Sequence, residues 1–174
     1  SLDSEWAGLL GKVGATRASL GVQTLAPEVQ ARIGRVQPLE LIERSVAMLR
    51  DAGVTSLNFD LMYGLPGQSE ADLIGTLEGA LRLQPDRIAL FGYAHVPQLI
   101  PRQRRIDADQ LPDVGTRFRQ AAIGHERLVS GGMQPVGFDH FARPADPLAV
   151  AAREDRLRRN FQGFTDDQSQ ILLG

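Results

Sequence analysis

Cysteine is absent from the 174 residues of this chain. Its absence excludes disulfides, thiolate nucleophiles, and any zinc or iron–sulfur site held by thiolates of this chain. Lysine occurs once, and the remaining basic residues are arginines; 19 basic against 21 acidic residues give a net charge of −2. This balance lacks the basic excess typical of nucleic-acid-binding proteins. Because no apolar run approaches the roughly 20 residues that span a bilayer, and no secretory signal opens the chain, we expect a cytoplasmic globular protein without a membrane span.

Strand and helix patterns alternate over the first hundred residues. Residues 16–24, 56–63 and 87–95 have the composition of mostly buried strands. Apolar residues at helical spacing precede the first strand, over 4–13, and separate the others, over 38–53 and 71–84. Pro38 and Gly53 are suited to the start and end of the second helix, and Ser69 with Asp72 forms a capping-box pattern before the third. This order predicts an α/β fold with a parallel sheet covered by helices.

The spacing of the strands indicates the kind of sheet. Their carboxyl ends fall near Gln23, Asp60 and Ala94, which are 37 and 34 residues apart. One βα unit per step is typical of TIM-type barrels, with right-handed crossovers. Three strands cannot close a barrel, so we expect the chain to be part of a longer protein. Residues 1–100 then form the barrel part, and residues 101–174 form an extension with a helix over 114–130, a short strand over 134–141 and a helix over 145–159.

Ligands of parallel sheets bind at the carboxyl ends of the strands, where this sequence has Gln23, Asp60 and Ala94. A buried carboxylate such as that of Asp60 needs hydrogen-bond donors; a ligand, a loop backbone or an arginine could supply them. The GLPG segment at 64–67 lacks the Lys-Ser/Thr element of a phosphate loop. The histidines have no metal-site spacing, so we expect no metal site. Arginine runs at 102–105 and 153–159 form either solvated faces or a cradle for a polycarboxylate. Spacing alone indicates no reaction.

Five segments occur in a characteristic order: SLGVQTLAPEVQARIGR at 19–35, NFDLMYGLPGQ at 58–68, LFGYAHVP at 90–97, GFDHFARPADPLAVA at 137–151 and RNFQGFT at 159–165. Together they resemble the oxygen-independent coproporphyrinogen III oxidase family of the radical SAM superfamily, over practically the whole chain. The first two segments are shared with other radical SAM proteins, whereas DHFARP and RNFQG are more specific to this family. The resemblance implies that residues 1–100 are the second half of a partial (β/α)6 barrel.

The resemblance also implies a reaction. Enzymes of this family decarboxylate two propionates of coproporphyrinogen III oxidatively to vinyl groups, which gives protoporphyrinogen IX in heme biosynthesis. A [4Fe–4S] cluster, reduced by an electron donor, cleaves S-adenosylmethionine, and the 5′-deoxyadenosyl radical removes a hydrogen from the propionate.

Five positions match residues of the family that contact S-adenosylmethionine. Gln23 and Arg35, twelve residues apart, match the pair that meets the methionine moiety. Asp60 matches the aspartate that would bind the ribose hydroxyls. Met62 matches a residue that packs on adenine, and Ala94 one whose backbone approaches it. A second S-adenosylmethionine site of the family involves residues that match Phe161 and Gln162.

Other family elements lie outside these 174 residues, which changes what the chain can do alone. The CxxxCxxC loop that holds the cluster, a glycine-rich segment, a glutamate and the C-terminal domain have no counterpart here. We therefore expect the isolated chain to be inactive and to self-associate through exposed sheet edges. Two alternatives stay open: a heme-chaperone relative that binds heme, which the DHFARP and NFQG elements disfavour, and a binding module without catalysis.

Overall fold

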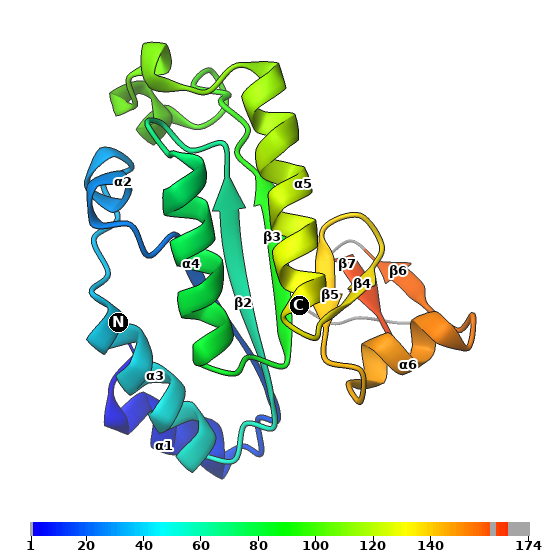
Figure 1. Ribbon diagram of the computed structural model, residues 1–174. Helices are drawn as coiled ribbons and strands as arrows, with labels where there is room; N and C mark the ends of the chain where they lie inside the picture. The colour runs from blue at the N-terminus through cyan, green and yellow to red at the C-terminus, as the bar shows by residue number, and fades with distance from the viewer. Residues whose placement is uncertain (1, 161–162, 167–174) are drawn as a thin grey trace.

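The computed structural model describes residues 2–160 and 163–166. A five-stranded sheet has the order β1-β2-β3-β5-β4, and a two-stranded sheet β6-β7 lies beside it (Figure 1). The strands are β1 Arg17–Gln23, β2 Ser56–Tyr63, β3 Arg87–Gly92, β4 Gln134–Val136, β5 His140–Ala142, β6 Arg158–Asn160 and β7 Gly163–Thr165. The helices are α1 Ser4–Lys12, α2 Pro27–Arg32, α3 Leu39–Asp51, α4 Glu70–Arg82, α5 Val114–Ser130 and α6 Pro147–Arg153, with 3-10 helices η1 Pro101–Arg105 and η2 Ala108–Gln110.

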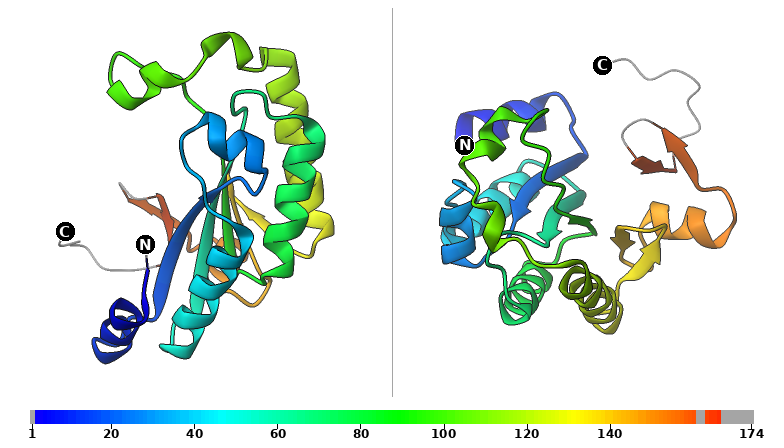
Figure 2. Two further views of the ribbon diagram at one scale, coloured as in Figure 1. Left: turned by 90° about the vertical axis from the view of Figure 1, so that its left-hand side faces the viewer. Right: turned by 90° about the horizontal axis from the view of Figure 1, so that it is seen from above.

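The parallel strands β1, β2 and β3 form the centre of the molecule. Alternate residues of β2 point to opposite faces, and Leu57, Phe59 and Leu61 are fully buried in the main core. This core also contains apolar side chains of α3, α4 and α5, including Leu49 and Leu77. Seen from above, these helices lie along the outer side of the curved sheet (Figure 2). The predicted α/β fold with a mostly parallel sheet is confirmed.

Local signals in the sequence position the helix ends. The amide of Asp72 donates to Ser69 Oγ at 3.1 Å, and the Asp72 carboxylate accepts from the Ser69 amide at 2.9 Å, so the capping box before α4 is confirmed. Pro38 is the N-cap residue of α3. Gly53, just beyond its end, has a φ of +93°, a left-handed conformation that glycine adopts without strain.

The carboxyl-terminal third differs from the prediction in two places. The single strand expected over 134–141 is wrong: two antiparallel three-residue strands, β4 and β5, turn at Gly137, whose φ is +78°. The helix expected over 145–159 is also wrong, because α6 ends at Arg153 and Asp155 has a φ of +57°. A residue in the left-handed region cannot continue a right-handed helix, and the chain enters β6 instead. The short helix α2 was not anticipated.

The sheet edges also differ from those expected of three bare parallel strands. Strand β5 pairs antiparallel with β3 at Arg87, Ile88 and Ala89 and covers that edge. In the part of the chain that the structure describes, β1 pairs only with β2. Edge strands with unpaired amides and carbonyls associate readily. We therefore expect the isolated chain to form oligomers as its concentration rises, measured by light scattering; a strict monomer at high concentration would contradict this prediction.

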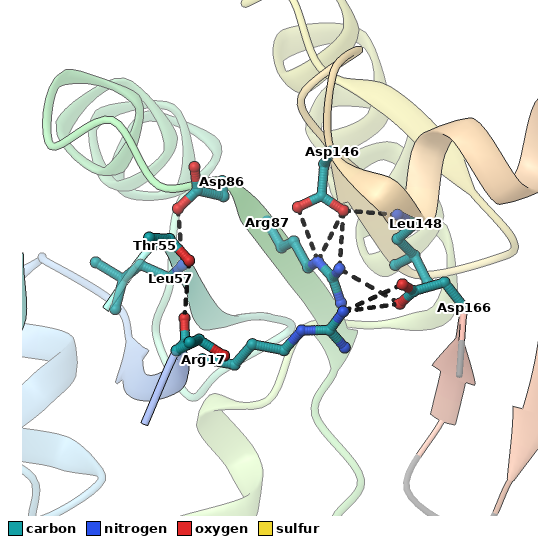
Figure 3. Close-up of polar contacts among 9 residues, drawn as sticks. Arg17, Thr55, Leu57, Asp86, Arg87, Asp146, Leu148 and Asp166 are labelled. Carbon is teal, nitrogen blue, oxygen red and sulfur yellow. Dashed lines mark hydrogen bonds and ion pairs between the residues drawn. The ribbon is translucent and has the colours of Figure 1, made fainter. Parts of the chain in front are cut away.

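Ion pairs fasten the carboxyl-terminal segment to the sheet (Figure 3). Arg87 on β3 binds Asp146, the N-cap residue of α6, with Nη2 2.9 Å from Oδ1 and Nε 3.0 Å from both carboxylate oxygens. Asp166 accepts from Arg17 Nη2 at 3.1 and 3.2 Å, and its Oδ1 lies 3.7 Å from Arg87 Nη2. Two strands of the parallel sheet are thus joined to residues more than fifty positions later.

Asp166 makes part of this attachment sensitive to acid. Burial alone would raise the pKa of its carboxyl group, but the hydrogen bond from Arg17, a backbone hydrogen bond and the charges of Arg17 and Arg87 hold the pKa below its usual value. A lowered pKa in the folded state means that the carboxylate stabilises the fold above its unfolded pKa of about 3.9. We expect this contribution to disappear as the pH falls below about 4. Urea unfolding across this pH range should show a smaller decrease in the free energy of unfolding for Asp166→Asn than for the wild type. The same pH dependence in both proteins would contradict this role of Asp166.

Candidate functional site

A cavity of about 700 Å³ opens at the carboxyl ends of the parallel strands. It contains three of the predicted ligand-binding residues, Gln23, Arg35 and Met62. The other lining residues come from α2 and the turn after it, from the ends of β2 and β3, and from η1: Ala31, Arg32, Ile33, Gly34, Leu65, Tyr93, Ile100, Arg102, Gln103, Arg105 and Ile106. The structure thus joins segments more than seventy residues apart in one hollow.

Gln23, the last residue of β1, has an unusual backbone. Its φ is +60°, and the pairing of β1 with β2 shifts between Gly21 and Gln23. A non-glycine residue in this region carries a strain of about 1 to 2 kcal/mol. The side-chain Oε1 is buried and has no hydrogen-bond partner within the described residues. A buried amide oxygen without a donor is costly, so this oxygen is a ready acceptor for a ligand.

Arg35 and Gln23 meet over Gly21. The Arg35 guanidinium donates from Nη2 to the Gly21 carbonyl at 2.8 Å and from Nε to Gln37 Oε1 at 3.0 Å. A Cβ atom on Gly21 would lie 3.1 Å from both Arg35 Nη2 and Gln23 Nε2. Any side chain there would crowd both groups. The pair that is twelve residues apart in sequence is therefore adjacent in space.

Asp60 lies on the same face of β2 as Met62 but lines a different hollow, of about 440 Å³. Its carboxylate accepts from Ser19 Oγ at 2.8 Å and from Asn58 Nδ2 at 2.8 Å. Asn58 Nδ2 also donates to Ser19 Oγ at 2.9 Å. Ser19 and Asn58 were not among the site residues predicted from the sequence. The two-residue alternation of β1 and β2 could have revealed them, since it places both on the face that carries Asp60.

The loop after β3 is held by a residue that the sequence did not indicate. Gln103 on η1 is only 8% exposed. Its Nε2 donates to the Ala94 carbonyl at 3.0 Å, and its Oε1 accepts from the Val96 amide at 2.6 Å. Ala94 itself is exposed. One amide side chain thus fixes two backbone groups on either side of His95.

Buried glutamines hold the other two strand-end loops in the same way. After β1, Gln30 Nε2 donates to the carbonyls of Thr24 and Gln37. After β2, Gln68 and the fully buried Gln120 together bind four backbone groups, those of Met62, Gly64, Leu65 and Gln68 itself. An amide suits this role because it carries both a donor and an acceptor. We name Gln30, Gln68, Gln103 and Gln120 the glutamine tethers.

The remaining candidates lie elsewhere or outside the description. His140 Nδ1 lies 2.6 Å from Asp139 Oδ1, while His95 Nδ1 lies 3.2 Å from the Tyr93 hydroxyl. Burial raises the pKa of that hydroxyl, which keeps it protonated at neutral pH. Among residues 2–160 and 163–166, no cluster of three or more histidine or acidic side chains could hold a metal ion. Phe161 and Gln162 lie outside the described residues.

Residues 1–80 match the radical SAM superfamily. A solved structure of coproporphyrinogen III oxidase from Escherichia coli, itself described as a radical SAM enzyme, superposes on the chain with a TM-score of 0.92 at 39% identity, covering 97% of this chain and 39% of that one. The chain is thus similar to radical SAM proteins over residues 1–80 and to this oxidase over nearly its whole length.

Curated proteins with similar sequences agree with the structural match. It is 49% identical over 165 residues to an oxygen-independent coproporphyrinogen III oxidase of Cereibacter sphaeroides, covering 95% of this chain and 36% of the relative. It is 50% identical over 161 residues to the protein of that name from Bradyrhizobium diazoefficiens, covering 92% and 36%. The chain therefore spans little more than a third of the length of these relatives. In the described part, no helix is long and apolar enough to cross a membrane.

Radical SAM proteins use S-adenosylmethionine and a [4Fe–4S] cluster. This chain has residues suited to bind S-adenosylmethionine but none suited to hold the cluster. The unpartnered Oε1 of Gln23 can accept from the ammonium of the methionine moiety, and Arg35 beside it can bind the carboxylate. The chain has no cysteine, so its residues do not hold the cluster.

We predict that Gln103→Ala in the full-length protein weakens S-adenosylmethionine binding about three- to tenfold. Two hydrogen bonds of roughly 0.5–1.5 kcal/mol each are lost, and the loop that carries Ala94 becomes free to move. Calorimetric titration measures the effect. Gln103→Glu is the matched control, because it keeps the acceptor for Val96 but loses the donor to Ala94. Unchanged affinity in both variants would show that the loop needs no tether.

Proposed function

We propose that the full-length protein is an oxygen-independent coproporphyrinogen III oxidase, which decarboxylates two propionates of coproporphyrinogen III oxidatively to vinyl groups and yields protoporphyrinogen IX. The likeness to the named relatives over 95% of the chain supports this function. The observation that carries it is the proximity of Gln23 and Arg35 beside Gly21, because a strained strand end with an unpartnered buried acceptor is suited to a bound ligand.

The residues of this chain then divide the binding of S-adenosylmethionine among them. Gln23 accepts from the ammonium and Arg35 donates to the carboxylate of the methionine moiety. Asp60, oriented by Ser19 and Asn58, accepts from the two ribose hydroxyls. Met62 packs against the adenine, and the backbone at Ala94 approaches its edge.

When bound, S-adenosylmethionine and the reduced cluster supply the one-electron chemistry that removes a hydrogen from the propionate. Phe161 and Gln162 match the positions that contact a second S-adenosylmethionine in the family, and we assign them that role. We expect Gln162→Ala to impair turnover with the cluster intact.

The proposed architecture follows from the same likeness. Residues 1–100 form the second half of a partial (β/α)6 barrel, and residues 101–174 form the extension towards a further domain. The free edge of β1 is where a preceding barrel strand would pair. The cysteine ligands of the cluster would come from the first half of the barrel, which these 174 residues do not include. The isolated chain is therefore inactive. A cytoplasmic location and an external electron donor stay predictions.

Anaerobic assay of the full-length protein tests the function. The protein is reconstituted with iron and sulfide, reduced, and given S-adenosylmethionine with coproporphyrinogen III; chromatography of the oxidised products should reveal protoporphyrin. Heme is titrated against the same preparation. Product formation supports an oxidase, whereas stoichiometric heme binding without product would overturn the proposal in favour of a heme-binding relative.

A further inference from the structure

Four arginines line the 700 Å³ cavity, namely Arg32, Arg35, Arg102 and Arg105, and no acidic residue is among the described residues that line it. Two of the four already have partners. Arg35 binds the Gly21 carbonyl and Gln37, and Arg32 binds Glu28 and the Gly67 carbonyl. Arg102 and Arg105 are exposed and have no hydrogen bond or ion pair with any part of the chain that the structure describes. The cavity therefore has a surplus of positive charge at its η1 side.

The helix η1 places two of these arginines on the side that faces the cavity. In a 3-10 helix of three residues per turn, side chains three positions apart lie above one another. Arg102 and Arg105 are such a pair, and both line the cavity. Arg104 lies between them in sequence, does not line the cavity, and donates from Nε to the Pro97 carbonyl at 3.3 Å. The buried Gln103 fastens the helix to the loop after β3. The segment lies over the carboxyl ends of the strands (Figure 1).

The charge of S-adenosylmethionine does not balance this surplus. Its ammonium and sulfonium are positive and its carboxylate is negative, so the molecule carries a net charge of about +1 at neutral pH. A second, anionic ligand can pair with these exposed guanidinium groups, which bind carboxylates well because they can donate two parallel hydrogen bonds. Apolar side chains beside the two arginines, those of Ile33, Ile100 and Ile106, offer a surface for a ring system.

We propose that Arg102 and Arg105 form a carboxylate-binding site that holds propionate groups of the tetrapyrrole substrate at the mouth of the cavity. This inference rests on the proposed function, and it assigns to the substrate two arginines without a partner among the described residues. The acidic residues nearest in sequence, Asp107 and Asp109, do not line the cavity. Asp107 is instead the N-cap residue of η2, where it accepts from the Asp109 amide.

The test measures binding of coproporphyrin III, the stable fluorescent oxidised form of the substrate, to the full-length protein by fluorescence titration. The double variant Arg102→Ala/Arg105→Ala should bind it roughly tenfold more weakly or worse, since charge-assisted hydrogen bonds are lost. Arg104→Ala, which removes one positive charge from the same helix outside the cavity, should bind about as well as the wild type. Affinity for S-adenosylmethionine and the near-ultraviolet circular dichroism should stay unchanged in both proteins.

A porphyrin with only two propionates, mesoporphyrin IX, separates charge pairing from apolar packing. The wild type should prefer coproporphyrin III over mesoporphyrin IX, and the double variant should lose that preference. Equal coproporphyrin affinity in the wild type and the double variant, with normal wild-type turnover, overturns this inference and leaves the proposed function standing. Failure of the wild type both to bind coproporphyrin III and to turn over coproporphyrinogen III overturns both.

Discussion

Replacing Arg87 by methionine should lower the free energy of unfolding by about 3 to 5 kcal/mol, because it leaves the charge of Asp146 buried and uncompensated. The Asp146 side chain is 4% exposed and that of Arg87 is 13% exposed. Arg87 Nε donates to both carboxylate oxygens of Asp146, and Nη2 lies within ion-pair distance of Oδ1 (Figure 3). Methionine keeps much of the length of the side chain but none of its donors. Urea unfolding at pH 7 measures the loss.

The effect of Arg87→Met can be separated from a general loss of ion pairs. Arg50→Met removes the pair with Asp86, whose side chains are 33% and 29% exposed, and should cost about 1 kcal/mol. Adding Asp146→Asn to Arg87→Met removes the orphaned charge and keeps an acceptor for the Leu148 amide. This double variant should recover a large part of the lost stability. Equal losses for Arg87→Met and Arg50→Met would show that the Asp146 charge is not the cause.

Asp60→Ala in the full-length protein should weaken S-adenosylmethionine binding by about 1.5–3 kcal/mol, roughly 10- to 150-fold. A carboxylate accepts both hydroxyls of a ribose, and alanine accepts neither. Because Ser19 and Asn58 already donate to this carboxylate, its orientation is fixed before a ligand arrives. Calorimetric titration of the reconstituted protein measures the affinity, and the absorbance of the cluster confirms that assembly is unaffected.

Two further variants distinguish contact from orientation at Asp60. Ser19→Ala keeps the carboxylate but removes one of the hydrogen bonds that hold it, so its effect should be smaller, about 0.5–1.5 kcal/mol. Asp51→Ala removes an exposed carboxylate at the end of α3 and should change nothing. Unchanged affinity in Asp60→Ala would remove this residue from the binding site.

The parallel strands could be predicted because their burial leaves a strong pattern. Strand β2 was expected over residues 56–63 and occupies those residues, since its alternating buried side chains give an unbroken apolar period. Strands β4 and β5 have three residues each, too few to establish a period of two. Their pairing depends on the turn at Gly137 and on the edge of β3, which is a contact between distant segments.

Site residues that lie in sequence motifs could be predicted, whereas those whose role depends on tertiary contacts could not. Gln23 and Arg35 were found through the resemblance, and the structure places them together. Gln103 lies in a charged, proline-containing stretch that reads as an ordinary loop. Its burial results from loops meeting at the end of the sheet, which the local sequence does not encode. The same holds for the isolation of Arg102 and Arg105 from acidic partners.

The glutamine tethers hold the strand-end loops by hydrogen bonds between neutral groups, whereas an ion pair joins the carboxyl-terminal segment to the sheet. The two regions should therefore respond differently to pH and salt. Amide side chains do not titrate in the range where proteins are folded, and salt screens interactions between charges far more than hydrogen bonds between neutral groups. Acid or salt therefore acts first on the Arg17–Asp166 pair that fastens the carboxyl-terminal segment. The loops around Gln23 and Ala94 keep their geometry under conditions that release that segment. Solutions below about pH 4, or of high salt concentration, should loosen the carboxyl-terminal segment while the strand-end loops stay in place.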